Sequence, residues 1–142
     1  MLNGKFHNSK SQISHNTVVL GKTKITPLFS PKDKIITNNI IPLIKNSKKY
    51  IYVPAFTITH DEFANELINA KKRGVDVKII IDATNVYSKK SKVKELRGAG
   101  VPVKVENYAG KLHSKSIIID DKYIVAGSMN FTNSGENKND EN

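Results

Sequence analysis

The sequence predicts an α/β fold, specifically an α/β/α sandwich built on a mixed, largely parallel β-sheet. The chain has 142 residues, of which 38% are hydrophobic, and this is enough to bury the core of one compact domain. Short segments rich in β-branched residues alternate with longer segments of helical periodicity. This strand, helix, strand order is typical of parallel strands joined by helical crossovers.

The first predicted elements lie before residue 60. Residues 33–45 (DKIITNNIIPLIK) place apolar side chains at helical spacing. Pro42 lacks a backbone donor and clashes with the preceding turn, so we expect a kinked or broken helix there. Residues 48–58 (KKYIYVPAFTI) are rich in β-branched and aromatic residues, which predicts a buried strand.

The clearest helix is predicted over residues 61–74 (DEFANELINAKKRG). Its apolar side chains fall on one helical face, and basic residues fill its last turn. Thr59 or Asp61 can cap its start. Residues 75–82 (VDVKIIID) then predict a second strand.

The remaining predicted elements are shorter. Residues 88–97 predict a second, more polar helix, and residues 101–106 predict a third strand. Residues 115–119 and 122–126 predict a β-hairpin. The last residues, 135–142 (GENKNDEN), contain no apolar side chain and would suit a disordered tail.

The charge balance favours a polyanionic partner. The chain has 23 Lys and Arg against 13 Asp and Glu, a formal charge of +10, which attracts nucleic acid or an anionic membrane. It has no cysteine, which excludes disulfides, thiol catalysis and sulfur-ligated zinc, and we expect neither a metal nor another cofactor. No apolar run could span a bilayer and the polar start lacks a secretory pattern, so we expect a cytoplasmic protein.

The segment from His113 to Asn130, HSKSIIIDDKYIVAGSMN, carries the chemistry. It fits the pattern H-x-K-x4-D-x6-G-S-x-N at every specified position, and such agreement is rare by chance. The segment resembles the HKD motif of the phospholipase D superfamily. Upstream, YIYVPAFTITHDEFANELINAKKRGVDVKIIIDATN resembles the strand, helix and strand that precede this motif in single-motif bacterial phospholipase-D-like endonucleases.

The resemblance implies a phosphodiesterase with His113 as its nucleophile, most simply a sequence-non-specific endonuclease. On a strand His113 and Lys115 point the same way, so a phosphodiester would meet an imidazole and an ammonium together. Attack by a neutral imidazole would form a phosphohistidine. The Ser128 hydroxyl and the Asn130 amide would donate hydrogen bonds to the non-bridging oxygens.

Two further residues are candidates for supporting roles. Asp120, seven positions after His113, falls on the opposite face of a regular strand, so we expect a structural or orienting role that the resemblance also implies. In relatives a Glu beyond G-S-x-N hydrogen-bonds the nucleophilic His, and Glu141 in N-x-E matches that pattern. We place His60 near a helix cap rather than in the catalytic set.

A single motif supplies half of a site, because a second group must protonate the leaving oxygen and then activate water. In this superfamily the second His comes from a second motif or from a two-fold-related partner, so we expect a homodimer that pairs two His113 side chains. A competing hypothesis assigns residues 1–24 to a decayed first motif. His7 and Gly21 have the same separation as His113 and Gly127.

The resemblance assigns residues 25–142 to a phospholipase-D-like domain. In relatives a further core strand and helix follow the N-x-E element, whereas this sequence ends at Asn142. We therefore expect a C-terminally truncated domain that lacks its last strand and helix and exposes an unpaired sheet edge. Under the competing hypothesis of a decayed first motif, the chain would be a fragment of a two-motif enzyme.

Two alternative functions use the same residues. The first is a phospholipase D that acts on anionic phospholipid, which would need an exposed apolar rim or amphipathic helix; the sequence indicates none. The second is a non-catalytic module that binds polyanions. The motif recognises only the phosphodiester, but the basic charge suits a DNA or RNA backbone held without base reading.

Overall fold

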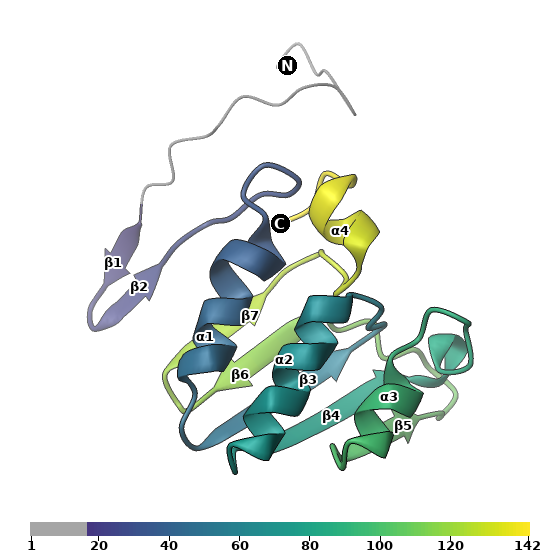
Figure 1. The fold of residues 1–142 in the computed structure, drawn as a ribbon. Coiled ribbons are helices and arrows are strands. Elements are labelled where there is room, and N and C mark those ends of the chain that lie inside the picture. The colour runs from purple at the N-terminus through teal and green to yellow at the C-terminus, as the bar shows by residue number, and fades with distance from the viewer. Residues whose placement is uncertain (1–16) are drawn as a thin grey trace.

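The computed structural model of the protein describes residues 17–142, so most of the hypothetical first motif lies outside the described residues. The main sheet has five strands in the order β5-β4-β3-β6-β7 (Figure 1). The strands are β3 (Tyr50–Ala55), β4 (Asp76–Asp82), β5 (Val103–Glu106), β6 (Ser116–Ile119) and β7 (Tyr123–Ala126).

The sheet is mixed, as predicted. Strands β3, β4 and β5 are parallel, whereas β6 is antiparallel to β3 and β7 is antiparallel to β6. The three parallel strands are the ones that helices connect. The turn between β6 and β7 is short, and a short turn can only join antiparallel strands. The α/β class is therefore confirmed, with two parallel and two antiparallel neighbour pairs.

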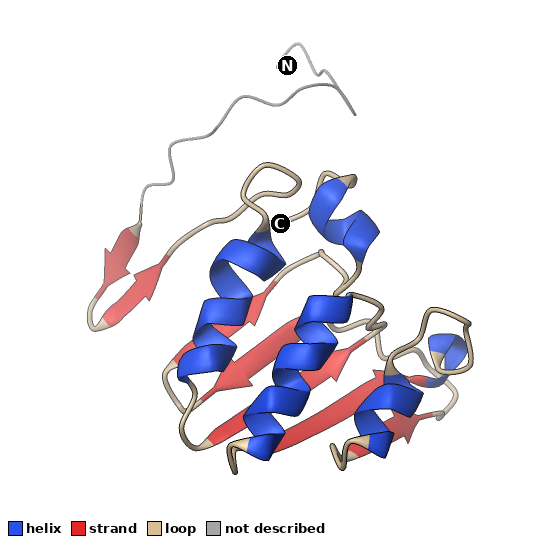
Figure 2. Cartoon of the chain, in the orientation of Figure 1, coloured by secondary structure: helices blue, strands red, loops and turns tan. Residues whose placement is uncertain are grey.

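The described helices lie over one face of the sheet (Figure 2). They are α1 (Ile41–Asn46), α2 (Asp61–Lys72), α3 (Val93–Gly98) and α4 (Asn133–Asn137). Alternate residues of β3 are buried beneath this layer, and those between them are half-buried on the opposite face. Within residues 17–142 the helices thus form one layer rather than the two layers of an α/β/α sandwich.

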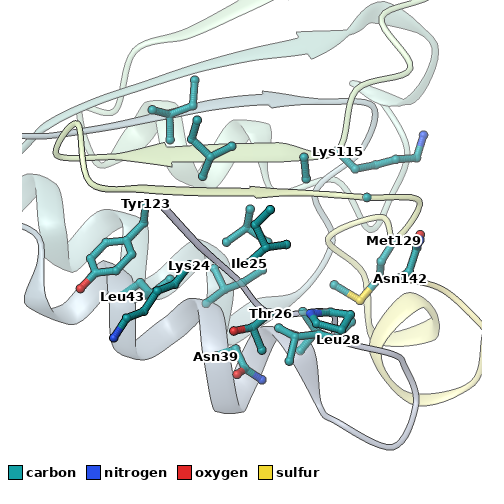
Figure 3. Close-up of a pocket in the computed structure, with 18 of the residues that line it drawn as sticks. Lys24, Ile25, Thr26, Leu28, Asn39, Leu43, Lys115, Tyr123, Met129 and Asn142 are labelled. Carbon is teal, nitrogen blue, oxygen red and sulfur yellow. The ribbon is translucent and has the colours of Figure 1, made fainter. Parts of the chain in front are cut away.

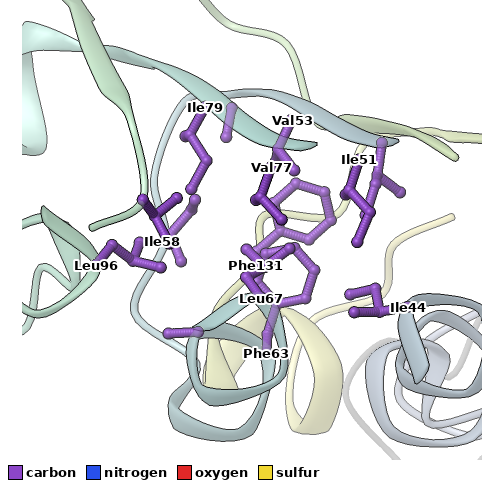
Figure 4. Close-up of a cluster of buried hydrophobic side chains, with 14 of the residues drawn as sticks. Ile44, Ile51, Val53, Ile58, Phe63, Leu67, Val77, Ile79, Leu96 and Phe131 are labelled. Carbon is purple, nitrogen blue, oxygen red and sulfur yellow. The ribbon is translucent and has the colours of Figure 1, made fainter. Parts of the chain in front are cut away.

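The core fills the space between the helices and the sheet (Figure 4). Helix α2 contributes Phe63 and Leu67, which are fully buried. The Phe63 ring stacks on Phe131 with centroids 4.5 Å apart, and Phe131 also forms a parallel bridge with Ile58. These contacts attach the segment after β7 to α2 and so fix the position of the G-S-x-N residues.

The helix is not broken at Pro42; it changes from π-helical to α-helical geometry at Ile41. A π-helical turn, Ile35–Ile40, runs into α1, and Pro42 occupies the first turn of α1, where its missing backbone donor costs little. The second helix was predicted too long, since α3 begins only at Val93. Residues 83–85 form a 3₁₀ turn, and the residues up to 92 form a loop.

The start of α2 and the C-terminal segment also differ from the sequence prediction. The side chain of His60, rather than Thr59 or Asp61, caps α2 by accepting from the Phe63 backbone N–H. Residues 135–142 are not a free tail, because part of α4 lies in them and Glu141 forms an antiparallel bridge with Ser30.

A separate hairpin of β1 (Val18–Leu20) and β2 (Thr23–Ile25) extends beyond the main sheet (Figure 1). All of its residues are exposed, including the apolar side chains of Val18, Val19, Leu20 and Ile25. No sequence pattern predicted this exposed apolar element. No helix within residues 17–142 is both long enough and apolar enough to cross a membrane.

Candidate active site

The β6–β7 hairpin brings the two ends of the motif together. His113 and Lys115 lie just before β6, and Gly127 and Ser128 lie just after β7, so antiparallel pairing places them at the same edge. The Gly127 backbone N–H donates to the Lys115 backbone O at 3.4 Å. A Cβ atom on Gly127 would lie 2.2 Å from the backbone O of Asn142, so this close approach requires glycine.

The same edge is the carboxyl end of β3. Ala55 forms an antiparallel bridge with Lys115, and the Phe56 backbone N–H donates to the Ser114 backbone O at 2.7 Å. The Phe56 ring then contacts both motif residues. Its centroid lies 4.8 Å from that of the His113 ring, edge to face, and 5.2 Å from Lys115 Nζ.

His113 and Lys115 differ in their exposure. The His113 side chain is exposed, whereas Lys115 is only 8% exposed and its Nζ donates to the His113 backbone O at 2.7 Å. Burial lowers the pKa of the Lys115 ammonium, and nearby Glu141 partly opposes this effect. Among residues 17–142 no carboxylate is in hydrogen-bond contact with this buried cation, and such a cation favours the approach of an anion.

Ser128 is held by the C-terminal residues. Its hydroxyl donates to Glu141 Oε2 at 2.6 Å and accepts from the Asn142 backbone N–H at 3.1 Å. Glu141 was expected to form a hydrogen bond with His113. In the structure its carboxylate accepts one from the Ser128 hydroxyl instead. The cause is the Ser30 backbone N–H, which donates to the Glu141 backbone O at 2.9 Å and holds this segment beside Ser128.

Asn130 has unused hydrogen-bonding capacity. Its side-chain Oδ1 is buried and has no hydrogen-bond partner among the described residues. The flanking residues Met129 and Phe131 are buried, so the backbone around Asn130 is anchored in the core. The unsatisfied Oδ1 is an acceptor, so contact with an anionic ligand would use the Nδ2 donors of the same fixed amide.

Asp120 lies at the far end of β6, in the turn before β7. Its carboxylate accepts the backbone N–H groups of Lys48, Lys49 and Tyr50 at 2.7, 2.8 and 2.9 Å. Burial raises the pKa of this carboxyl, but the three backbone hydrogen bonds outweigh that effect and the pKa is lowered. The geometry supports the structural role expected for Asp120, because these bonds join the hairpin turn to the start of β3.

His60 belongs to a second buried polar cluster. Its Nε2 lies 2.8 Å from Glu136 Oε2, and Glu136 Oε1 accepts the Thr37 backbone N–H at 2.7 Å. Both His60 and Glu136 are buried. The pair connects α2, α4 and the π-helical turn, which is a structural arrangement consistent with leaving His60 outside the catalytic set.

Two loops lie at the carboxyl ends of the parallel strands, on the side of the sheet where β3 reaches the motif. Residues 83–92 follow β4, and residues 107–114 follow β5 and lead to His113. Each loop exposes a tyrosine, Tyr87 (94% exposed) and Tyr108 (61% exposed). The loops also carry exposed basic residues: Lys89, Lys90 and Lys111.

No sequence pattern pointed to Phe56, Tyr87, Tyr108 or Glu136. The motif pattern specifies none of them, and aromatic residues in a strand or loop carry no signal of their own. Among residues 17–142, no group of three or more His, Asp or Glu side chains is arranged to hold a metal ion.

An α/β domain with a His, Lys, Ser and Asn cluster at one sheet edge defines the class of protein. Residues 40–142 match the family described as cardiolipin synthase, PLD-like domain. The chain belongs to this family, within the phospholipase D superfamily of phosphodiesterases.

Curated relatives agree with this assignment. The chain is 35% identical over 144 residues to the phospholipase D of Rickettsia prowazekii, an alignment that covers 100% of this chain and 70% of the relative. It is 28% identical over 105 residues to the mitochondrial cardiolipin hydrolase of Chlamydomonas reinhardtii, which covers 74% of this chain and 47% of that protein.

Two solved structures have the same fold. Nuc from Salmonella typhimurium, a phospholipase D family member, superposes with a TM-score of 0.72 and 32% identity, covering 80% of this chain and 75% of Nuc. NucT from Helicobacter pylori superposes with a TM-score of 0.69 and 27% identity, covering 80% of this chain and 79% of NucT.

Proposed function

We propose that this phosphodiesterase is a sequence-non-specific nuclease that cleaves single-stranded DNA or RNA without a metal ion. Exposed tyrosines on the same side of the sheet as the motif support this proposal. Tyr87 and Tyr108 lie in the two loops at the carboxyl end of the sheet, together with exposed lysines. Aromatic rings stack on unpaired bases of any sequence, and lysines contact the phosphates between them.

The proposed reaction has two displacement steps. A ring nitrogen of His113 attacks phosphorus, the bond from phosphorus to the leaving oxygen breaks, and a phosphohistidine forms. Water then attacks this phosphorus and releases His113. The Lys115 ammonium and the Asn130 amide stabilise the charge on the non-bridging oxygens in both steps, which is the contribution that a metal ion makes in other phosphodiesterases.

Proton transfer is assigned to a second histidine, because His113 acts as the nucleophile. His113 of the partner subunit in a homodimer would protonate the leaving oxygen and then accept a proton from the attacking water. Glu141 acts indirectly in this scheme. It orients Ser128 through its hydrogen bond and contributes negative charge near Lys115. The catalytic domain is assigned to residues 25–142.

The proposal is tested by comparing substrates in excess EDTA. We expect the wild-type chain to cleave single-stranded DNA and RNA and to hydrolyse bis-p-nitrophenyl phosphate, and His113→Ala to do neither. The double variant Tyr87→Ala, Tyr108→Ala should raise KM for single strands by about 30-fold or more, because stacking contributes about 1–3 kcal/mol per base and two rings are removed. Hydrolysis of the small reporter should be unchanged in this variant.

Different failures have different meanings. Equal KM values in the double variant and the wild type would remove the stacking argument while leaving phosphodiesterase activity intact. Binding of single strands that weakens with salt, without any product, would instead indicate a non-catalytic polyanion-binding module.

A lipid substrate is the second candidate function, and two observations favour it. Relatives bear the names phospholipase D and cardiolipin hydrolase. The β1–β2 hairpin also exposes Val18, Val19 and Leu20 next to Lys22 and Lys24, a combination suited to an anionic membrane surface. Release of phosphatidic acid from cardiolipin vesicles, with no cleavage of single strands, would favour this function over the nuclease.

A further inference from the structure

The two backbone neighbours of His113 are held by the ends of two adjacent strands. After His113 in the chain, the Ser114 backbone O accepts the Phe56 N–H at 2.7 Å, just beyond β3. Before His113, the Leu112 backbone N–H donates to Asp82 Oδ2 at 2.9 Å. Asp82 is the last residue of β4, the parallel neighbour of β3. His113 therefore lies between one fixed point after β3 and another at the end of β4.

The other residues of the motif edge are held from the opposite side. Figure 3 shows Lys115, Met129 and Asn142 toward one end of the pocket between β7 and residues 23–29. In this region the Asn142 backbone O accepts the Met129 N–H at 3.1 Å. Strand β4 lies on the other side of β3 from β6 and β7, so the contact made by Asp82 is separate from these.

Asp82 is a buried carboxylate whose two oxygens have different partners. The residue is only 2% exposed, and its Oδ1 accepts the Thr84 backbone N–H at 2.8 Å. Hydrogen bonding with Thr84 is the main cause that lowers the Asp82 pKa; the Leu112 hydrogen bond and the charge of Lys111 act in the same direction, and burial opposes them. The carboxylate is therefore ionised at neutral pH, and hydrogen bonds to an ionised acceptor are among the stronger ones.

The bond from Leu112 anchors the segment that leads to His113. Within residues 17–142 it is the hydrogen bond that joins residues 108–112 to the sheet. Residues 108–111 are exposed and Leu112 is half-buried, so packing contributes little to fixing this segment. A segment with few buried contacts opens easily, and the backbone position of His113 therefore depends on Asp82.

We propose that Asp82 is a positioning residue for the nucleophile, which holds the Leu112 N–H and thereby keeps the His113 imidazole in line with phosphorus. Asp82 acts through the backbone and does not contact the substrate. The inference rests on the proposed function, in which His113 attacks phosphorus. Attack requires the reacting atoms to be aligned at about 3–3.5 Å, so a displaced His113 lowers kcat without weakening substrate binding.

The first test is Asp82→Asn, which removes the charge and one of the two acceptor oxygens. An asparagine also bonds the backbone N–H two residues on, so its oxygen should stay with Thr84 and its NH₂ group would face the Leu112 N–H. We expect kcat on bis-p-nitrophenyl phosphate to fall about tenfold, with KM unchanged. The pH dependence of kcat should also be unchanged, which separates positioning from a charge effect on the imidazole.

Two further variants keep the test sharp. Asp82→Ser retains a cap for the Thr84 N–H but is too short to reach Leu112, so it should lower kcat to a similar extent. Asp76→Asn is the matched control, because it makes the same substitution at the opposite end of β4, where the carboxylate accepts from Tyr52 and Lys78. Its kcat should equal that of the wild type.

Backbone NMR relaxation gives a measurement that needs no turnover. The order parameter of the His113 amide should fall from about 0.85, typical of rigid backbone, to below about 0.6 in Asp82→Asn, and should stay high in Asp76→Asn. Normal kcat in both Asp82 variants, an equal loss in Asp76→Asn, or an unchanged order parameter at His113 would each overturn the proposal. Loss of order at His113 with a wild type that hydrolyses no reporter would support the anchoring by Asp82 and overturn the proposed function instead.

Discussion

Phe56 contacts both residues to which the proposed chemistry assigns the largest roles. Its ring packs edge to face against His113 and lies under Lys115 Nζ. His113 itself is exposed, and Phe56 is the described side chain whose ring contacts its imidazole. The orientation of the nucleophile therefore depends on an apolar neighbour just after β3 that the motif does not specify.

Phe56→Ala is expected to lower kcat on bis-p-nitrophenyl phosphate by about tenfold, since a displaced nucleophile loses part of the advantage of fixed geometry. KM should change little, because the ring does not donate to the phosphate. Phe56→Tyr keeps the ring and should retain most of the activity. A normal kcat in Phe56→Ala would show that His113 is positioned without this contact.

The charged Lys115 side chain is expected to lower the unfolding free energy of the chain, although it serves catalysis. Its lowered pKa means that the folded chain binds this proton less tightly than the unfolded chain does. The charged form therefore costs stability at neutral pH, and the cost disappears as the pH rises above the unfolded pKa. Lys115→Met should raise the unfolding free energy by about 1 kcal/mol and lower kcat by about 100-fold or more.

Urea denaturation and reporter kinetics on the same samples test this pair of effects. A loss of stability in Lys115→Met would mean that the ammonium is compensated in the folded chain, contrary to the exposure and contacts described above.

At the scale of elements, the β6–β7 hairpin depends on Asp120. Its three backbone hydrogen bonds join the turn to the start of β3, far from the motif edge. We expect Asp120→Ala to lower the unfolding free energy by about 2 kcal/mol, because it leaves three donors without their acceptor. Activity well below the melting temperature should be nearly unchanged.

The neighbouring Asp121→Ala is the matched control. Asp121 accepts one hydrogen bond from the Tyr50 hydroxyl and has the same positive φ of 56° as Asp120. Both variants therefore carry the same backbone cost of alanine, and Asp121→Ala should lose clearly less stability than Asp120→Ala. Thermal and urea unfolding of the two variants would measure this difference. Similar losses in both variants would contradict the role given to Asp120.

Element prediction succeeded where local periodicity and composition agree with tertiary packing. The sequence of α2 has an apolar face and a basic last turn, and the helix forms close to the predicted bounds. It failed where long-range contacts decide. The second helix was predicted to begin at residue 88, but residues 86–92 form a loop and α3 begins at Val93. Glu141 pairs with Ser30, which lies more than a hundred residues earlier in the chain.

At the scale of the whole molecule, the buried Glu136 connects separate parts of the fold. It binds His60 on α2 and the Thr37 backbone N–H. A buried carboxylate in a segment without apolar residues could not be predicted from sequence, because only its partners, each more than seventy residues away, explain its burial. The catalytic motif was visible because its fixed spacing is local to one hairpin.

Acid unfolding tests this connection. Burial raises the Glu136 pKa, but hydrogen bonds from Thr37 and His60 outweigh it and the pKa is lowered, as it is for Asp120. Such groups contribute stability above their unfolded pKa, about 4, and this contribution is lost as the pH falls through the folded pKa. Unfolding free energies should therefore drop from about pH 5 downward.

Glu136→Gln should be less stable than the wild type at pH 7 and should lose less stability between pH 5 and pH 3. Urea denaturation at a series of pH values measures both effects. Parallel curves for the variant and the wild type would mean that Glu136 does not contribute to the acid transition.

The central claim of this account is that His113 attacks phosphorus. The most direct test is to quench a reaction with a single-stranded oligonucleotide in alkali, digest the protein and identify modified peptides by mass spectrometry. The account predicts a phosphoryl-linked adduct on the peptide that contains His113, present in excess EDTA and absent in His113→Ala. An adduct on another residue, or equal turnover by His113→Ala, would contradict it.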